Sequence, residues 1–374
     1  MLILKPQNEK NVDEFSEPMI KFVNAVLRRV GRDGIEMLEK HTTAAQNIAP
    51  WLVEEWRKDW GEENTMKICE EMFVEPHTDL TVNFGLWDMS AETKLTELEN
   101  LRTDFGSEAI ILPNYSIRTG SEMKGAVTSW PHFDEGKWWV QDVSSTLPAI
   151  ALYNALTREG NDISQFNVVD MCSAPGGKTA QLISAGFGHV TAVEANSRRC
   201  RRLEENLKRL GFQDKCTVVV AEGQNWNGLE TSINRMNNEI DAILLDVPCS
   251  ATGTGSRRPD VLRRSNDLGN LLETQQAIAN HCVDNLLTNG SIMIYATCSL
   301  LKRESEDQVQ KLLSRGNPDE NKAVMKTVPF IPGEMNGFDA AIDENGWLRV
   351  LPGVLDGNLK SCDGFFVARL EKIG

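Results

Sequence analysis

The sequence predicts an α/β protein whose larger part is a doubly wound, mostly parallel sheet, preceded by a smaller helical and α/β region. From about residue 165, short runs of β-branched and aliphatic residues alternate with helical patterns, an order typical of right-handed βαβ crossovers. A glycine-rich turn follows the first run, and each of two later runs is followed by a cysteine. The carboxyl ends of parallel strands are where such sheets present their ligand-binding residues. The expected strands are 167–171, 190–194, 216–222, 242–246, 291–297 and 364–370, and the expected helices are 178–186, 197–211 and 270–287.

The N-terminal part of the chain predicts a small module before this sheet. Residues 16–34 carry apolar side chains at helical spacing and end at a glycine, and the tryptophan-rich segment 46–74 predicts further helices. Further expected elements are a strand at 80–87, a helix at 92–102, a strand at 108–117, and a strand and a helix within 138–157. We therefore expect three regions, at 1–38, 39–125 and 126–374.

Length and composition exclude several classes of protein. The chain has 374 residues, 41% of them hydrophobic, which is enough for two or three domains with a full core. No run of eighteen apolar residues is present, and the first residues lack the basic and apolar segments of a signal peptide. We expect a soluble, cytoplasmic protein without a membrane span. No exposed heptad pattern stands out, so we expect a monomer.

The eight cysteines do not form a metal-binding or disulfide pattern. They include no CxxC pair and no short regular spacing, so neither a zinc cage nor another metal site is expected. The ordinary interpretation of a cysteine in such a chain is a small, reduced, buried residue. Only Cys249 and Cys298, which follow predicted strands, have a context that favours chemistry.

The charge of the chain is acidic and uneven. The net charge of −15 argues against indiscriminate binding of nucleic acid through a basic field over the whole protein. Residues 1–150 hold 15 Lys and Arg against 26 Asp and Glu, whereas residues 151–374 hold 24 against 28. Two local segments, 197–210 and 256–264, are rich in arginine, and such segments are most often solvated faces.

The turn after the strand at 167–171 reads MCSAPGGKTAQ, and it predicts a ligand loop. A phosphate loop of the form GxxxxGK[ST] would need glycine at position 172, which is Cys172, and the dinucleotide pattern GxGxxG is absent. A loop for a nucleoside cofactor remains, since backbone N–H groups at a strand-to-helix turn can approach a ligand closely. Glu194 and Glu222, near the ends of the next two strands, could then receive the hydroxyls of a ribose and the other side of an adenosine.

The strands at 242–246 and 291–297 lead into Asp246, Cys249 and Cys298. A thiolate is a strong nucleophile, and a carboxylate beside it can hydrogen-bond an electron-poor ring and help the ring accept that nucleophile. Two thiols and one carboxylate at neighbouring strand ends suit addition to a heteroaromatic ring, with one thiol attacking and the other group assisting removal of a proton.

Together, the segments DMCSAPGGKT, LLDVPCSATGTGSRRPD, IYATCSL and DGFFVARLEK resemble the RNA cytosine-C5 methyltransferases, and most closely the Sun/RsmB-type bacterial enzymes (NOL/NOP/Sun-like) that modify 16S ribosomal RNA. The likeness runs from about residue 125 to the end, and weaker matches extend it nearly to the start. It implies a Rossmann-like, class I fold that binds S-adenosylmethionine. It also implies that residues 1–38 are a remnant of a NusB-like helical domain and that 39–125 form a small RNA-binding module.

The resemblance also implies a role for each site residue. Cys298, in the TCS motif, would add to C6 of a cytosine, Cys249 would assist loss of the C5 proton and release of the enzyme, and Asp246 would bond the N3 edge of the ring. The target base would be unpaired or flipped out. Arg257, Arg258 and Arg263 would contact RNA phosphates. The cofactor residues implied are Cys172, Ser173, Ala174, Pro175, Gly176, Gly177, Lys178, Glu194, Glu222 and Asp246.

The chain departs from the family pattern at three places, and other functions compete. Glu194 and Glu222 stand where the family has aspartates, the SRRPD segment has a shifted register, and only the last helix of the NusB-like domain is evident. The alternatives are a transfer-RNA cytosine-C5 methyltransferase, a nucleotide hydrolase suggested by GGKT, and a catalytically inert RNA-binding or ribosome-assembly factor. Cys172 in place of glycine counts against the hydrolase, and the set of Asp246, Cys249 and Cys298 counts against the inert factor.

Overall fold

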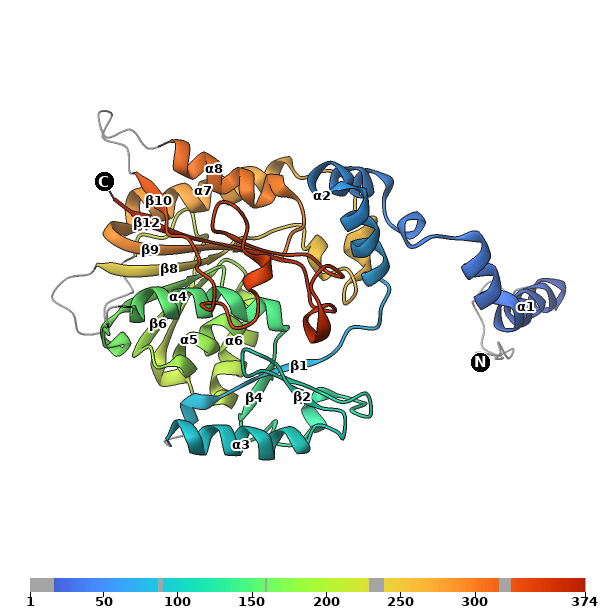
Figure 1. Ribbon diagram of the computed structural model, residues 1–374, viewed down its shortest axis with the longest axis horizontal. Coiled ribbons are helices and arrows are strands. Elements are labelled where there is room, and N and C mark those ends of the chain that lie inside the picture. Colours follow the sequence, from blue (N-terminus) through green and yellow to red (C-terminus); the bar gives the residue numbers. More distant parts are fainter. Residues whose placement is uncertain (1–16, 87–89, 159, 229–238, 316–323, 374) are drawn as a thin grey trace, which may run out of the picture.

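The fold consists of a large sheet and a small sheet with helices packed around them (Figure 1). The computed structural model describes residues 17–86, 90–158, 160–228, 239–315 and 324–373. The large sheet has eight strands in the order β10-β12-β9-β8-β5-β6-β7, with β11 paired to β12. The small sheet has the order β2-β3-β1-β4.

The large sheet confirms the predicted doubly wound α/β fold. Its strands β5 to β9 are parallel where they pair, and β12 runs antiparallel to β9 at the far side. Long apolar runs form its central strands because both faces are covered. Its strands are β5 (Asn167–Met171), β6 (His189–Glu194), β7 (Cys216–Val220), β8 (Ile240–Asp246), β9 (Leu287–Thr297), β10 (Met325–Thr327), β11 (Leu348–Val350) and β12 (Phe365–Lys372).

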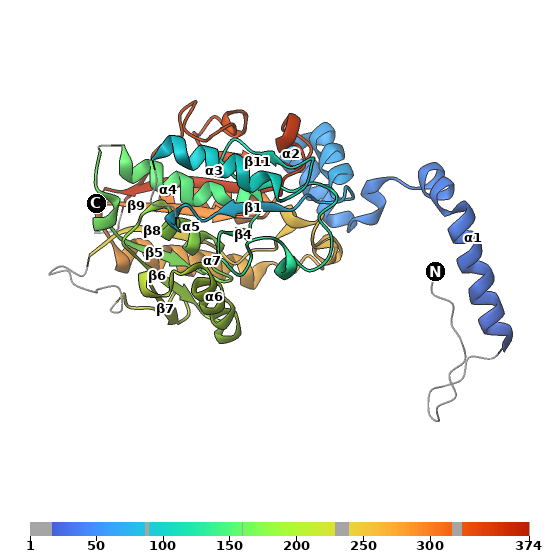
Figure 2. The same ribbon diagram turned by 90° about the horizontal axis from the view of Figure 1, so that it is seen from below.

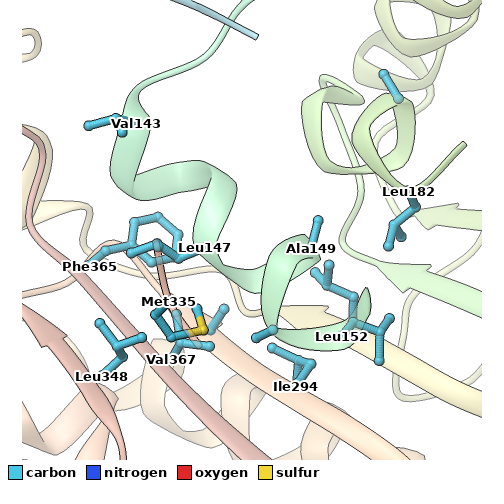
Figure 3. Close-up of a cluster of buried hydrophobic side chains, with 14 of the residues drawn as sticks. Val143, Leu147, Ala149, Leu152, Leu182, Ile294, Met335, Leu348, Phe365 and Val367 are labelled. Carbon is cyan, nitrogen blue, oxygen red and sulfur yellow. The ribbon is translucent and has the colours of Figure 1, made fainter. Parts of the chain in front are cut away.

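Helices cover both faces of the large sheet (Figures 1 and 2). One face carries α4 (Leu147–Thr157), α5 (Gly177–Ala185) and α6 (Ser197–Leu210), and the other carries α7 (Gly269–His281) and α8 (Glu306–Ser314). Figure 3 shows Leu147 and Leu152 of α4 directed at the strand residues Ile294, Phe365 and Val367, all buried. This apolar layer fixes α4 over the strands that lead to the two cysteines.

The small sheet is formed by β1 (Asp79–Val82), β2 (Ile110–Ile111), β3 (Ile117–Arg118) and β4 (Trp138–Val140), with α3 (Ala91–Thr103) beside it. The single strand expected at 108–117 is wrong, because Tyr115 takes a left-handed conformation (φ 64°) and the chain turns back between β2 and β3. Because β4 pairs with β1, the small sheet continues beyond the boundary predicted at residue 125. The last residue of the strand expected at 80–87, Trp87, lies outside the described residues.

The remaining helices precede the small sheet. The buried residues Leu52, Trp56 and Ile68 of α2 (Pro50–Glu71) pack in one cluster with residues of the loops that follow β8 and β9. In both views α1 (Glu17–His41) projects away from the rest of the chain (Figures 1 and 2). The prediction of a NusB-like remnant at 1–38 stays a prediction, and residues 1–16 of it lie outside the described part. Within that part no helix combines the length and apolarity that crossing a bilayer requires.

A network of buried ion pairs joins the small sheet to the large one. Arg118 of β3 donates two hydrogen bonds to Asp79 of β1, at 2.7 and 2.9 Å, and it also donates to the carbonyl of Asn358. Asp142, which follows β4, accepts from Arg257 at 2.8 Å, and Arg257 also donates to Asp363 at 3.1 Å. These pairs hold the small sheet against the loops after β8 and before β12.

We predict that Asp79→Ala lowers the free energy of unfolding by about 3–5 kcal/mol, because the guanidinium of Arg118 then stays buried without its counter-charge. Urea unfolding followed by circular dichroism measures this loss. Glu62→Ala is the matched control, since Glu62 pairs with Arg57 at 2.6 Å on the surface and its removal should leave the unfolding midpoint unchanged. Equal losses for the two variants would contradict the prediction.

Candidate active site

The two cysteines that follow the predicted strands lie together. In the parallel pairing of β8 with β9, Asp246 is opposite Ala296. The segments that follow the two strands therefore leave the sheet side by side. Cys249 and Cys298 are both half-buried, and their Sγ atoms are 3.4 Å apart. This distance allows a hydrogen bond between the two thiols, and either thiol can be the donor.

Backbone contacts hold the loops that carry these cysteines in one arrangement. The amide of Val247 donates to the carbonyl of Ala296 at 3.0 Å, and the amide of Gly253 donates to the carbonyl of Cys298 at 2.9 Å. A Cβ atom at Gly253 would lie 2.7 Å from the carbonyl oxygen of Cys298 and closer still to that of Gly364. Glycine at this position therefore allows three loops to meet without separating the thiols.

A partly buried ion pair lies beside the thiols. Lys178, the second residue of α5, donates from Nζ to Oδ2 of Asp246 at 2.7 Å, and its ammonium is 5.2 Å from the centre of the Phe365 ring. Burial disfavours the charged ammonium, but the charge of Asp246 outweighs burial and raises the pKa of Lys178. Lys178 therefore fixes the carboxylate of Asp246 by one oxygen and supplies a positive charge to the site.

The electrostatics of the site keep Cys298 protonated. The hydrogen bond with Cys249 raises the pKa of the Cys298 thiol well above its ordinary value, burial and the charge of Asp246 raise it further, and Lys178 opposes them. A thiolate is the reactive form of cysteine, so Cys298 becomes a nucleophile only when its proton leaves toward a neighbouring base or added positive charge stabilises the thiolate.

The glycine-rich turn after β5 forms a loop closed onto the sheet. Cys172 (φ 63°) and Gly176 (φ 99°) take left-handed conformations, and the amide of Ser173 donates to the carbonyl of Val193 at 3.1 Å. Thr179 donates to the fully buried Asp170 at 2.5 Å, which connects the start of α5 to β5. Burial raises the pKa of Asp170 to about 7. The loop therefore turns tightly from β5 into the N-terminus of α5 at the end of the sheet where parallel strands present ligands.

Glu194 fits the cofactor implied by the resemblance. It ends β6, is 4% exposed, and accepts from the amide of Asn196 with Oε1 at 2.9 Å. Its Oε2 is buried and accepts no hydrogen bond; Arg199 lies 3.1 Å away as an ion-pair partner but out of hydrogen-bond alignment. Oε2 is thus a carboxylate oxygen without a hydrogen bond, which is the kind of acceptor that a ribose hydroxyl requires. Glu222, beyond the end of β7, is exposed and accepts from Asn225 at 2.8 Å.

The three arginines expected to contact RNA differ in their surroundings. The guanidinium of Arg257 is engaged by Asp142 and Asp363, and their charges outweigh burial and raise its pKa. In this arrangement Arg257 is part of the buried ion-pair network rather than a surface cation. Arg258 and Arg263 are exposed. Their guanidinium groups are therefore the ones of the three that are most accessible to an RNA phosphate.

The sequence did not reveal one buried residue beside the site. Glu304 is fully buried below both cysteine loops, although its segment KRESE is polar enough to predict a solvated turn. A hollow of about 480 Å³, lined by residues of β1, α3, α4 and α5, includes none of the predicted site residues. The site is therefore identified by its chemistry and not by the size of a cavity.

We predict that alkylation of Cys298 by iodoacetamide is slow at neutral pH and rises with pH in the alkaline range, because its raised pKa keeps the thiolate scarce. Cys249→Ala removes the first cause of that shift, so the midpoint of the alkylation profile should move to lower pH. Mass spectrometry of the Cys298 peptide measures both profiles.

Cys249→Ser is the control for this experiment, since it retains a hydrogen-bonding group of similar size at position 249. Its midpoint should lie between those of the wild type and Cys249→Ala. A midpoint in Cys249→Ala that equals the wild-type midpoint would show that Cys249 does not set the pKa of Cys298. Wider access to the site would change the maximal rate but not the midpoint.

We predict that Gly253→Ala costs about 1–3 kcal/mol of unfolding free energy, because its Cβ would press against two backbone carbonyls that cannot turn away. Thermal or urea unfolding measures the loss. Gly269→Ala, where the added Cβ meets no atom within 4 Å, is the control and should cost no stability. An unaffected Gly253→Ala would mean that the three loops are not tightly packed.

Comparisons with known proteins agree with this geometry. Residues 155–371 match the family of the 16S rRNA methyltransferase RsmB/F. The chain is 32% identical over 364 residues to the ribosomal RNA small subunit methyltransferase B of Klebsiella pneumoniae, with 95% of this chain and 74% of the relative covered.

Two solved structures share the fold. The NSun6 structure from Pyrococcus horikoshii with SFG has a TM-score of 0.65 at 18% identity, covering 88% of this chain and all of that one. A methyltransferase homolog from the same organism has a TM-score of 0.62 at 23% identity, covering 87% of this chain and all of that one. These likenesses confirm the Rossmann-like fold expected of the larger sheet.

The family match extends over more than half of the chain and includes β5 to β9, the glycine-rich loop and both cysteines. The cofactor of this family is S-adenosylmethionine, which the loop at 172–178 and Glu194 fit. The chain belongs to the RsmB/F family of methyltransferases and is an S-adenosylmethionine-dependent RNA cytosine-C5 methyltransferase.

Proposed function

We propose that this protein methylates C5 of a cytosine in 16S ribosomal RNA through a covalent adduct between Cys298 and C6 of the base. The observation that carries the proposal is the pair of thiols 3.4 Å apart beside the Lys178–Asp246 ion pair. The name of the Klebsiella pneumoniae relative, a small-subunit ribosomal RNA methyltransferase, supports the choice of RNA.

In this proposal the two thiols act on adjacent carbons of the ring. The Sγ of Cys298 gives its proton to the carboxylate of Asp246 and adds to C6, and Asp246 passes this proton to N3, which neutralises the negative charge that would otherwise spread over the ring. Lys178 holds Asp246 in place through Oδ2. The cofactor, when bound, supplies the methyl group that C5 takes up.

Release requires a base at C5. The thiolate of Cys249, which has given its own proton to solvent, removes the C5 proton, and the electrons of that C–H bond form the C5–C6 double bond. The S–C6 bond breaks, and the sulfur of Cys298 takes back the proton from N3 through Asp246. This division of work suits the observed geometry, because the two sulfur atoms lie 3.4 Å apart and can each face one of two adjacent ring carbons. The cytosine must leave its stack to reach these groups, so the target is unpaired or flipped out.

The cofactor would bind at the loop that follows β5, between residues of three neighbouring strand ends. Residues 172–178 offer their backbone to the cofactor, and Glu194 offers its buried Oε2 to a ribose hydroxyl. Glu222 and Asp246 complete the proposed set, Glu222 from its exposed position after β7. Arg258 and Arg263 are the proposed phosphate contacts. We also propose that the protein acts as a monomer in the cytoplasm. Residues 39–125 would act as its RNA-binding module.

We predict that Cys298→Ala lowers methyl transfer to unmodified 16S ribosomal RNA by more than about 100-fold, since it lacks the nucleophile. Cys249→Ala should instead accumulate a protein–RNA adduct, because the C5 proton stays in place and the S–C6 bond cannot break. Transfer of labelled methyl from S-adenosylmethionine measures activity, and denaturing gels show the adduct.

Cys216→Ala is the matched control, since Cys216 begins β7 at the edge of the sheet opposite the thiols and should leave transfer unchanged. Activity in Cys298→Ala together with its loss in Cys249→Ala would reverse the assignment of nucleophile and base. Transfer by the wild type to transfer RNA but not to 16S ribosomal RNA would move the proposal to the other RNA.

A further inference from the structure

Glu304 lies at the centre of a buried polar cluster below both cysteine loops. It ends a short 3-10 helix (Lys302–Glu304) and is fully buried. Its Oε1 accepts from the amide of Ser250 at 2.9 Å and from Nε2 of Gln275 at 3.0 Å. No step of the mechanism above uses this carboxylate.

The second oxygen of Glu304 connects the two loops directly. Its Oε2 accepts from Oγ of Ser299 at 2.5 Å and also from Oγ of Ser250. Ser250 follows Cys249 and Ser299 follows Cys298, and the two hydroxyl oxygens are 3.1 Å apart. One carboxylate oxygen therefore holds the residue next to each thiol.

A carboxylate suits this buried position better than an amide would. Burial of a carboxylate is costly unless it is paired or fully hydrogen-bonded. Among the described residues no cation forms an ion pair with Glu304, so the four hydrogen bonds to its two oxygens are what offset the cost of burial. A carboxylate offers acceptors only, so both hydroxyls have to point toward it, whereas an amide would place a donor against them. The buried carboxylate therefore fixes the direction of two hydroxyls, and those hydroxyls in turn satisfy one of its oxygens.

We propose that Glu304 is a positioning residue that sets the separation of the Cys249 and Cys298 thiols. This inference rests on the proposed function, in which one thiol bonds C6 while the other removes a proton from the adjacent C5. Two groups that act on neighbouring ring atoms need a fixed spacing, and a misplacement of about 1 Å can cost about 100-fold in rate. Ser250 and Ser299 transmit the position of Glu304 to the two cysteines.

The test compares Glu304→Gln with Glu334→Gln. Glu334 is a second, largely covered glutamate whose side chain is 9% exposed, but it bonds Arg369 and Arg158 and not the cysteine loops. Two readouts are taken on folded protein, as judged by urea unfolding: the kcat and KM of methyl transfer to 16S ribosomal RNA, and the affinity for phenylarsine oxide, which bridges two close thiols and needs no RNA.

Glu304→Gln should lower kcat by about 10–100-fold with little change in KM for RNA, and it should weaken phenylarsine oxide binding by at least about 10-fold. Glu334→Gln should leave both readouts unchanged. Replacing both Ser250 and Ser299 by Ala should reproduce the loss, and adding Glu304→Gln to that double variant should cost little more, because the three residues act as a unit.

Three results would overturn or separate the proposals. Unchanged arsenical affinity in Glu304→Gln, with or without a loss of kcat, overturns the positioning role, because the thiol spacing is then intact. An equal loss in Glu334→Gln also overturns it, since general destabilisation would explain both. If the wild type methylates no RNA but arsenical binding depends on Glu304, the proposed function fails while the positioning role stands.

Discussion

The parallel pairing of β8 with β9 is the constraint on which the site depends. Because Asp246 lies opposite Ala296 in that pairing, the chain delivers Cys249 and Cys298 to one point from two segments 49 residues apart in sequence. A slip of one residue in the register would turn every side chain of a strand to the other face. The apolar layers from α4 and α7 on the two faces of the sheet oppose such a slip.

Polar contacts take over where the strands end. The loops beyond β8 and β9 have no further sheet partners, and their backbone groups bond each other, Thr252 and the carboxylate of Glu304. On the outer side, the pair of Arg257 with Asp142 and Asp363 joins the same region to the small sheet. Burial and the charge of Asp142 raise the pKa of Asp363, and the guanidinium of Arg257 opposes them.

The sequence predicted the elements whose signal is local. Apolar runs such as 242–246 had to be buried strands, and the chemistry of Asp246, Cys249 and Cys298 placed the site at their ends. The turn at Tyr115 escaped prediction because a left-handed conformation is unusual for a tyrosine. The contacts of Arg257 and the burial of Glu304 escaped it because they depend on partners far away in sequence, such as Asp142, which no local pattern reveals.

The close approach of Gly253 and Gly364 has an evolutionary consequence. The amide of Gly364 donates to the carbonyl of Gly253 at 2.8 Å, and a side chain at either position would meet the backbone of the other loop. The loop of one cysteine and the start of β12 therefore share a single volume. These positions should therefore evolve together. A substitution of either glycine should be found only in homologues whose neighbouring loops have changed as well.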